Sequence, residues 1–426
     1  MKFSAAAALL VISAGCLVAQ QGDLKQRIRA VRDLGKSGSE SITKLAPYVS
    51  DPEPEVRIEA VKALGNIGTA RSLDPLIAAT TDNDPEVQIR ATDGLVNFYS
   101  PGYIQRGLSA SLKRAGNAVR AKFSDNNDLV IPAYVQVRPE VVAAIGKLAR
   151  GGMSMDSRAN AARAIGILRG RAALEDLYSA LRSKNDQVMY ESIVAIQKIR
   201  DESAGSRLIF LLRDLNDRVQ GAAIETVGLL RTKESVPVLH DLVKNARNEK
   251  ARRASLSALA MIADPSSKPL FTQYLADKDD ALRAAAAEGY ARLKDRADLP
   301  VVSKYFDGEA KMNPRLSFAF ASVALGRNDF GEFSPLRYLV NTLNSAAYRG
   351  VAQPFLLELS RDPGVRRTLY NALNGATRDE KIYLGQVFAQ VGDKETLRYL
   401  EAMATDSDPA VAEEGVRSLK TLKARI

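Results

Sequence analysis

A phrase that recurs at a fixed interval constrains the fold of this chain more than any other feature. The segment 51–68 reads DPEPEVRIEAVKALGNIG, and the segment 82–99 reads DNDPEVQIRATDGLVNFY. Each copy opens like a turn and continues like a short helix. The predicted helix starts are marked by Val56, Val87, Ser157, Val188, Val219, Ala251, Leu282, Pro314, Glu380 and Val411, with a loosely kept unit near Ser345. A fixed period in the range of roughly 20 to 50 residues indicates a stack of like units.

The pattern inside one period predicts two helices. The residue four places after the helix start is small in eight of these ten units, as at Ala60 and Ala91, and the residue eight places after it is apolar in nine, as at Leu64 and Leu95. These positions share one helical face, and a small residue there lets a second helix approach closely. Prolines that suit the first turn of that second helix follow their helix starts at a nearly constant interval, at Pro75, Pro237, Pro269 and Pro300.

One such helix pair cannot bury its apolar face alone, so neighbouring pairs must stack into a continuous core. The sequence therefore predicts an all-α fold, a right-handed α-solenoid with about 11–12 helical hairpin repeats over residues 23–426. An insertion at residues 100–138 interrupts the third repeat, and PEVVAAIGKLARGG, which follows it, is predicted to be the displaced second helix.

The phrases DPEPEVRIEAVKALGNIG, DNDPEVQIRATDGL, DKDDALRAAAAEGYARL and DSDPAVAEEGVRSL resemble the HEAT-repeat family, in particular its short phycobilisome-lyase-like variety. The resemblance implies a ladder between repeats, formed by an acidic residue in the turn and a basic residue early in the first helix. Asp51 with Arg57, and Asp277 with Arg283, have the spacing of such a ladder. At Asp82 and Asp214 the later residue is a glutamine, so the expected ladder is partial.

The insertion at 100–138 is a candidate binding element, because insertions in solenoids often decorate a binding face. Its first half fits an amphipathic helix with a basic stripe, and no acidic residue occurs between Asp93 and Asp125. The stripe can equally be a solvated face whose apolar side packs on the solenoid. The candidate partner-binding residues are Tyr103, Arg106, Lys113, Arg114, Arg120, Lys122 and Tyr134, although structural packing also explains the aromatic ones.

The N-terminal segment 1–19, MKFSAAAALLVISAGCLVA, fits a secretory signal peptide. The stretch SAGC resembles a bacterial lipobox, in which Cys16 would be acylated and would anchor the chain to a membrane. Ordinary cleavage after Ala19 is the alternative. Either route predicts an exported protein, in the periplasm or anchored as a lipoprotein at the outer membrane of a bacterium.

The composition excludes several kinds of catalytic and metal site. Cys16 is the only cysteine and His240 the only histidine, so the folded part cannot hold a disulfide or the usual zinc and non-haem iron sites. His240 beside Asp241 fits a surface or packing residue. The stretch DNND at 125–128 resembles part of a calcium loop but fits a turn better, because the remaining ligand spacing is missing. No cofactor and no metal is expected.

These observations favour a non-enzymatic scaffold that binds a protein partner through the concave face formed by the second helices, with the insertion modifying that face. The formal net charge of +10 permits an acidic partner. One alternative is a chromophore lyase-like protein, which the export signal disfavours. Another is a nucleic-acid-binding protein, which the export signal and the lack of tryptophan disfavour, so no nucleic acid is expected.

Overall fold

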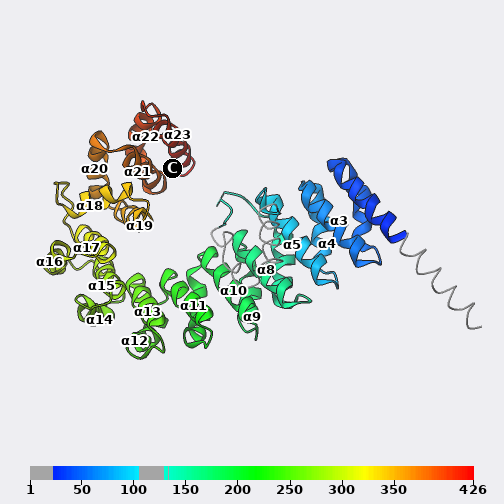
Figure 1. Cartoon of the computed structure of the whole chain (residues 1–426), viewed down its shortest axis with the longest axis horizontal. Helices are drawn as coiled ribbons and strands as arrows, with labels where there is room; N and C mark the ends of the chain where they lie inside the picture. The colour runs from blue at the N-terminus through cyan, green and yellow to red at the C-terminus, as the bar shows by residue number, and fades with distance from the viewer. Residues whose placement is uncertain (1–22, 105–128, 133) are drawn as a thin grey trace, which may run out of the picture. The chain divides into compact units, whose positions relative to one another are not determined.

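The computed structural model describes residues 23–104, 129–132 and 134–426, and within these ranges the chain is helical and contains no strand (Figure 1). The fold is therefore an all-α repeat solenoid, as predicted. The five basic candidates of the insertion, Cys16 and the DNND stretch lie outside the described residues.

Long first helices alternate with shorter second elements. The first helices are residues 23–36, α3 (Pro54–Ile67), α5 (Pro85–Tyr99), α8 (Met155–Ile167), α10 (Asp186–Ile199), α11 (Asp217–Leu229), α13 (Glu249–Ile262), α15 (Asp280–Leu293), α17 (Met312–Ala324), α19 (Arg349–Leu359), α21 (Arg378–Val391) and α23 (Pro409–Lys423). The second elements are the short helical turns η1 (Gly38–Ser41), α2 (Ile42–Leu45) and η2 (Ala46–Ser50) together, then α4 (Leu73–Ala79), α7 (Pro139–Gly151), α9 (Leu174–Ala180), η5 (Glu202–Arg213), α12 (Val236–Asn245), α14 (Lys268–Tyr274), α16 (Leu299–Gly308), α18 (Pro335–Asn341), α20 (Pro363–Ala372) and α22 (Leu397–Ala404). In the described part of the chain this gives eleven pairs and a final first helix, α23, which agrees with the predicted repeat number.

The predicted helix starts agree with the structure at ten of the eleven positions. Each of the ten is the third residue of its helix, as Val56 is in α3 and Val411 in α23. The expectation near Ser345 was wrong by several residues, because α19 begins only at Arg349. The 3₁₀ turn η9 (Thr342–Asn344) and a further turn lengthen this connection. Residues 139–151 form α7, as predicted for the displaced second helix.

Two side chains in each well-kept turn have different tasks. In the turn before α5, Asp84 accepts hydrogen bonds from the backbone N–H groups of Glu86 and Val87 and so caps the helix. Asp82, two residues earlier, accepts from the N–H of Asp84 and keeps its other oxygen for a neighbouring repeat. Asn185, Asp279 and Asp408 cap α10, α15 and α23 in the same way.

Small residues set the distance between neighbouring first helices. A Cβ atom on Gly65 of α3 would lie 3.0 Å from the Cα of Gly94 in α5, and one on Gly166 of α8 would lie 2.8 Å from the Cα of Ala195 in α10. A side chain at these glycines would push the helices apart. Gly415, one of the small mid-face residues, faces the backbone of α22 in the same manner.

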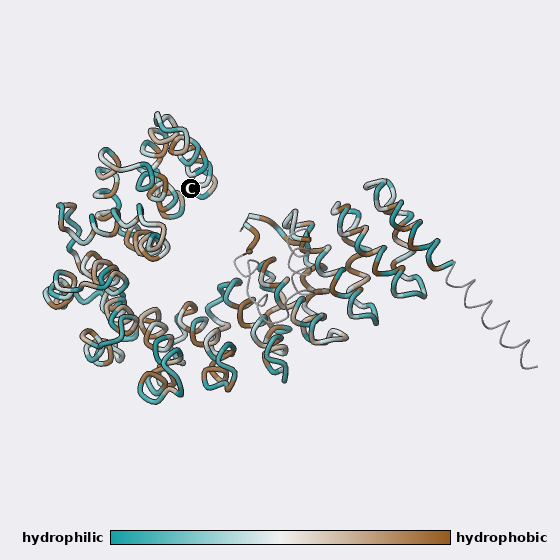
Figure 2. The backbone as a smooth tube through the Cα atoms, in the orientation of Figure 1, coloured by the Kyte–Doolittle hydropathy of each residue, from teal (hydrophilic) through white to brown (hydrophobic). Residues whose placement is uncertain are grey.

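The chain divides into two compact units, one ending at Thr226 and the other beginning at Val227. In the first unit α3, α5, α8 and α10 pack in sequence, and in the second α13, α15, α17, α19, α21 and α23 do so, with second elements packed against them. Hydrophobic and hydrophilic residues alternate along the helices in Figure 2, as expected where one face of each helix is buried. The largest buried side chains of the second unit are aromatic, whereas those of the first are leucine and isoleucine.

Arginines join the turns of successive repeats. Arg57 in α3 is nearly buried and forms a bidentate ion pair with Asp82 in the next turn, at 2.8 and 2.9 Å. Its remaining nitrogen donates to the backbone oxygens of Asp51 and Pro52 in its own turn. The carboxylate of Asp51 accepts from Arg27 of the preceding helix. Each cation therefore links its own turn to the turn that follows.

The ladder was thus predicted in the right residues but with the wrong partners. Asp51 and Arg57 do not pair through their side chains, because the six-residue spacing brings the arginine to the backbone oxygen of Asp51. Arg283 likewise donates to the backbone oxygen of Asp277, at 2.7 Å, and pairs with Glu309 of the next repeat. A glutamine can also link two successive turns. The side chain of Gln88 donates to the backbone oxygen of Asp82 in its own turn and accepts from the N–H of Met153 in the turn before α8.

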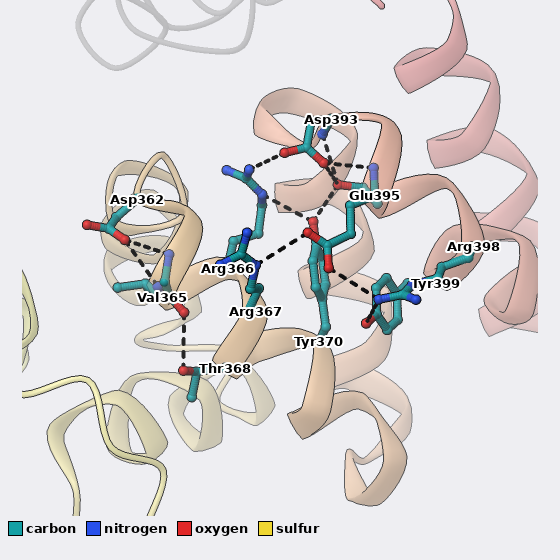
Figure 3. Close-up of polar contacts among 12 residues, drawn as sticks. Asp362, Val365, Arg366, Arg367, Thr368, Tyr370, Asp393, Glu395, Arg398 and Tyr399 are labelled. Atoms are coloured by element: carbon teal, nitrogen blue, oxygen red, sulfur yellow. Dashed lines mark hydrogen bonds and ion pairs between the residues drawn. The ribbon is translucent and has the colours of Figure 1, made fainter.

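A related link joins two second elements near the C-terminal end (Figure 3). Arg366 in α20 is buried and donates to the backbone oxygen of Ser360, to the Tyr370 hydroxyl and to Asp393 in the turn before α22. The Tyr370 hydroxyl lies 2.5 Å from that of Thr396. Every nitrogen of this buried guanidinium therefore has an acceptor, as a buried charge requires.

We expect Arg57→Met to lower the free energy of unfolding by about 3 kcal/mol, because it leaves Asp82 and two backbone oxygens without their donor. Urea denaturation followed by circular dichroism measures this. The matched control is Arg32→Met, which removes an exposed ion pair to Glu59 and should cost less than about 1 kcal/mol. Equal losses of unfolding free energy for the two variants would show that the buried ion pair stabilises the fold no more than an exposed one.

Candidate binding surface

The structure describes two of the seven partner-binding candidates, and it separates them. Tyr134 is 83% exposed, in the non-helical segment that precedes α7. Tyr103 is only 5% exposed, which fits the structural packing weighed for it and not a role as a surface anchor. Its ring packs in the interior because it follows directly after α5, where the chain turns over the ends of the first helices.

The described ends of the insertion attach to three first helices. The N–H of Ile104 donates to Asn97 of α5, at 3.2 Å, and the N–H of Ile131 donates to the backbone oxygen of Ile167 of α8, at 2.9 Å. Lys198 of α10 donates to the backbone oxygen of Leu129, at 3.2 Å. The expectation that the insertion modifies a face formed by second helices does not fit these ends. They lie at the C-terminal ends of α5, α8 and α10, because the insertion leaves the chain where a first helix ends.

Polar side chains link these same helices. Asn160 of α8 donates to Asp93 of α5 at 3.0 Å, and Arg163 of α8 forms two hydrogen bonds with Glu191 of α10, at 3.1 and 2.7 Å. Burial raises the pKa of Asp93 to about 6, against the opposing effects of the Asn160 hydrogen bond and of nearby arginines. The charged form of Asp93 therefore destabilises the fold, and this loss of stability grows as the pH rises and the carboxyl group ionises.

A hollow of about 410 Å³ lies further along the layer of first helices, between α10 and α11. Gly221 and Ala222 of α11 leave the space, because they stand where α10 carries Tyr190 and Glu191. The hollow is lined by Tyr190, Val194, Gln197, Asp217, Arg218, Gly221, Ala222 and Glu225. The Arg218 guanidinium stacks on the Tyr190 ring at 3.4 Å, so its main contacts are made within the protein.

A notch of about 420 Å³ lies on the other layer, between the second elements α9 and η5. It is lined by Tyr178, Arg182, Ser206, Arg207, Ile209 and Phe210. The Arg207 guanidinium lies 5.3 Å from the centre of the Tyr178 ring, and Phe210 is 57% exposed. Arginine, tyrosine and phenylalanine are enriched at protein interfaces, so this notch is the best candidate binding site in the described residues.

The backbone of η5 explains how the notch forms. Glu202–Arg213 is an unusually long 3₁₀ helix, because such helices seldom exceed a single turn. With three residues per turn, Gly205, Leu208 and Leu211 form one buried row, and Arg207 and Phe210 stand together in an exposed row. Sequence reasoning expected an ordinary second helix here and missed the notch. The buried residues of this segment, Ala204, Gly205, Leu208, Leu211 and Leu212, also fit the spacing of an α-helix, so the sequence carried no clear signal of the 3₁₀ helix.

His240 has a structural environment. It is half-buried on α12, and its Nε2 atom lies 2.9 Å from the Ser267 hydroxyl of the next repeat. Burial lowers its pKa. Among the described residues, no group of three or more histidine, cysteine, aspartate or glutamate side chains could hold a metal ion. None of the described helices is both long and apolar enough to span a bilayer.

Many solved structures are similar to this chain, among them the following three. YibA of E. coli is 16% identical with a TM-score of 0.41, and the match covers 70% of this chain and 96% of YibA. An engineered protein is 18% identical with a TM-score of 0.31, covering 90% and 98%. The CpcE–CpcF complex of phycocyanin lyase from Nostoc sp. is 16% identical with a TM-score of 0.29, covering 66% and 93%. No curated protein matches the chain.

The stacked helix pairs and their turns define the chain as an α-solenoid repeat protein. The family described as HEAT repeats matches two regions of the chain, residues 17–96 and 205–291. Both regions therefore contain HEAT repeats, as the repeating phrases indicated.

We expect Asp93→Asn to be more stable than the natural chain at pH 7.5 by about 1–2 kcal/mol. A carboxyl group whose pKa is higher in the folded than in the unfolded state stabilises the fold less as the pH rises from about 4 to about 6. The difference should therefore disappear near pH 4, which urea denaturation at the two pH values tests. Glu225→Gln, at an exposed carboxylate, is the control, and a stability difference for Asp93→Asn that does not change with pH would contradict the assignment.

Proposed function

We propose that this HEAT-repeat protein is a non-enzymatic scaffold that binds a partner protein in a bacterial cell envelope. The observation that carries the proposal is the notch between α9 and η5, where two arginines, an exposed phenylalanine and a tyrosine from adjacent repeats share one surface. Residues of these types supply much of the binding energy at protein interfaces. Repeat solenoids offer such surfaces because neighbouring units are held side by side.

We further propose that the partner is acidic, because the candidate binding residues are mostly basic. Besides the arginines of the notch, the insertion carries Arg106, Lys113, Arg114, Arg120 and Lys122, and the chain as a whole has a formal net charge of +10. Opposite charge on a partner would speed encounter and favour one orientation. In this proposal the partner contacts the concave face formed by the second elements, and the basic insertion, whose described ends attach to first helices, offers a separate contact.

The absence of catalysis is proposed because several of the described carboxylates have structural roles. Asp82 and Glu309 receive arginines from the preceding repeat, and Asp84 and Asp408 cap helices. His240 is hydrogen-bonded to a buried serine and lines neither the notch nor the hollow. These groups are held in place by the fold, which suits a scaffold.

The envelope location rests on the N-terminal segment 1–19. Its apolar run and the SAGC stretch support export, either with acylation of Cys16 or with cleavage after Ala19. A lipid anchor would hold the solenoid at a membrane while leaving its surfaces accessible to a partner.

A pull-down from native envelope extracts, read by mass spectrometry, tests the scaffold. The bait is residues 20–426, and the matched bait has residues 105–128 replaced by a glycine–serine linker of equal length. This replacement keeps Ile104, Leu129 and Ile131, which attach the insertion to α5, α8 and α10. We expect the first bait to capture a discrete protein. Capture only by the first bait would assign recognition to the insertion, and capture by both would assign it to the solenoid. If neither bait retains a protein above an unrelated control, the proposal fails.

Export is tested by labelling a bacterial culture with an azide-bearing fatty acid and measuring the mass of the mature chain. A labelled protein whose label is lost in Cys16→Ser is the result expected for a lipoprotein. An unlabelled chain beginning at Gln20 would favour the alternative of cleavage after Ala19. An unprocessed chain in the cytosolic fraction would exclude the proposed location.

A further inference from the structure

We propose that the notch between α9 and η5 binds an acidic segment of the partner protein, with an apolar side chain against Phe210 and a carboxylate at Arg207 and Arg182. This inference rests on the proposed scaffold function and identifies the chemistry of the partner. It concerns only the described residues of the first unit.

The size and the walls of the notch suit an extended segment with one large side chain. Its volume of about 420 Å³ lies within the usual range of ligand pockets. Helix α9 and the residues directly after it supply Tyr178 and Arg182, and η5 supplies Ser206, Arg207, Ile209 and Phe210. Both walls thus belong to consecutive repeats, whose spacing is fixed by first-helix packing behind them.

The apolar part of the notch is left uncovered. Phe210 is 57% exposed, whereas Leu208 and Leu211 on the same element are buried. An apolar group that covers the exposed Phe210 ring would remove apolar surface from water, which is favourable. This selects a partner segment that carries a large apolar side chain.

The two cations are available to a ligand. Within the described residues, neither the Arg182 nor the Arg207 side chain has an ion pair or a hydrogen bond. Arg207 makes a cation–π contact with Tyr178 at 5.3 Å. A guanidinium that stacks on a ring through its face keeps its N–H edges, which match a carboxylate in a bidentate arrangement.

The acidic residues nearby do not neutralise these arginines. None of the six lining residues is acidic. Burial, together with the charges of Asp201 and Glu175, raises the pKa of Tyr178, so these two carboxylates lie near the notch, but among the described residues no ion pair or hydrogen bond joins them to Arg182 or Arg207. Asp176 pairs with Arg150 at 3.4 Å, and Asp201 pairs with Arg171 at 2.8 Å. The charge of the notch therefore favours an acidic segment over a basic one.

The 3₁₀ geometry of η5 makes the arrangement specific to this repeat. Residues three apart eclipse in a 3₁₀ helix, so Arg207 and Phe210 stand in line on one side. In an α-helix the same pair would be turned about 60° apart. The cation and the apolar surface are consequently presented together to one segment.

The test uses three short rhodamine-labelled peptides and fluorescence anisotropy with the chain 20–426. The first peptide has the central sequence DEDFLEDE. The second has asparagine and glutamine in place of its acids, and the third has serine in place of its phenylalanine and leucine. We expect the first peptide to bind at least about tenfold more tightly than either of the others.

Variants locate the binding. Arg207→Glu and Phe210→Ser should each weaken the first peptide by at least about tenfold. Arg207→Lys should weaken it less, because the charge remains while the planar fork is lost. The matched controls are Arg296→Glu and Phe333→Ser, at an exposed arginine in the turn η8 (Arg296–Asp298) and at a phenylalanine that is 83% exposed. Both should bind like the natural chain, and circular dichroism confirms that every variant is folded.

Three outcomes would overturn the inference: no binding of the acidic peptide, equal binding of the neutral peptide, or equal losses in notch and control variants. The pull-down separates this failure from failure of the scaffold function. If a bait with Arg182→Glu, Arg207→Glu and Phe210→Ser still captures the native partner, the scaffold function stands and the notch inference falls.

Discussion

The contact between neighbouring first helices is the interaction on which the rest of this structure depends. A single helix pair has too little apolar surface to bury by itself, so every repeat is stabilised by the next one. Glycine and alanine bring these helices close, as at Gly65 against Gly94 and Gly166 against Ala195. Because the contact recurs in each period, it places turns, caps and second elements at regular intervals, and it fixes which surfaces face the solvent.

The regular spacing also decides where charge can be buried. Each ladder arginine satisfies the backbone oxygens of its own turn and the carboxylate of the next, so the desolvation of the guanidinium is offset by several charge-assisted hydrogen bonds. Turn carboxylates such as Asp51 and Asp82 are thereby engaged in contacts between repeats. The described departures from the repeat are the ends of the insertion after α5, the small residues of α11 and the 3₁₀ element η5.

These departures explain how much of the candidate site was predictable. The insertion was visible because it breaks the period, but the sequence left two roles open for Tyr103, a surface anchor and a packing residue, and the side chain lies in the interior. Its burial depends on the helix ends that it meets, which belong to other repeats. The notch was missed because Tyr178 and Phe210 come from different periods and only packing places them together. The change from an α-helix to a 3₁₀ helix at η5 is a shift in hydrogen bonding that residue type signals weakly.

The amino-acid sequence by itself determined the period, the two-helix unit, the helix starts and the likeness of its phrases to HEAT repeats. These follow from local rules, because hydrophobic spacing, capping residues and small residues act within one helix or its immediate neighbour. Only the tertiary structure decided which carboxylate each ladder arginine binds, where the ends of the insertion attach, and which arginines stay without a partner. Those outcomes depend on distances between residues of different repeats, and these distances are set when the repeats pack together.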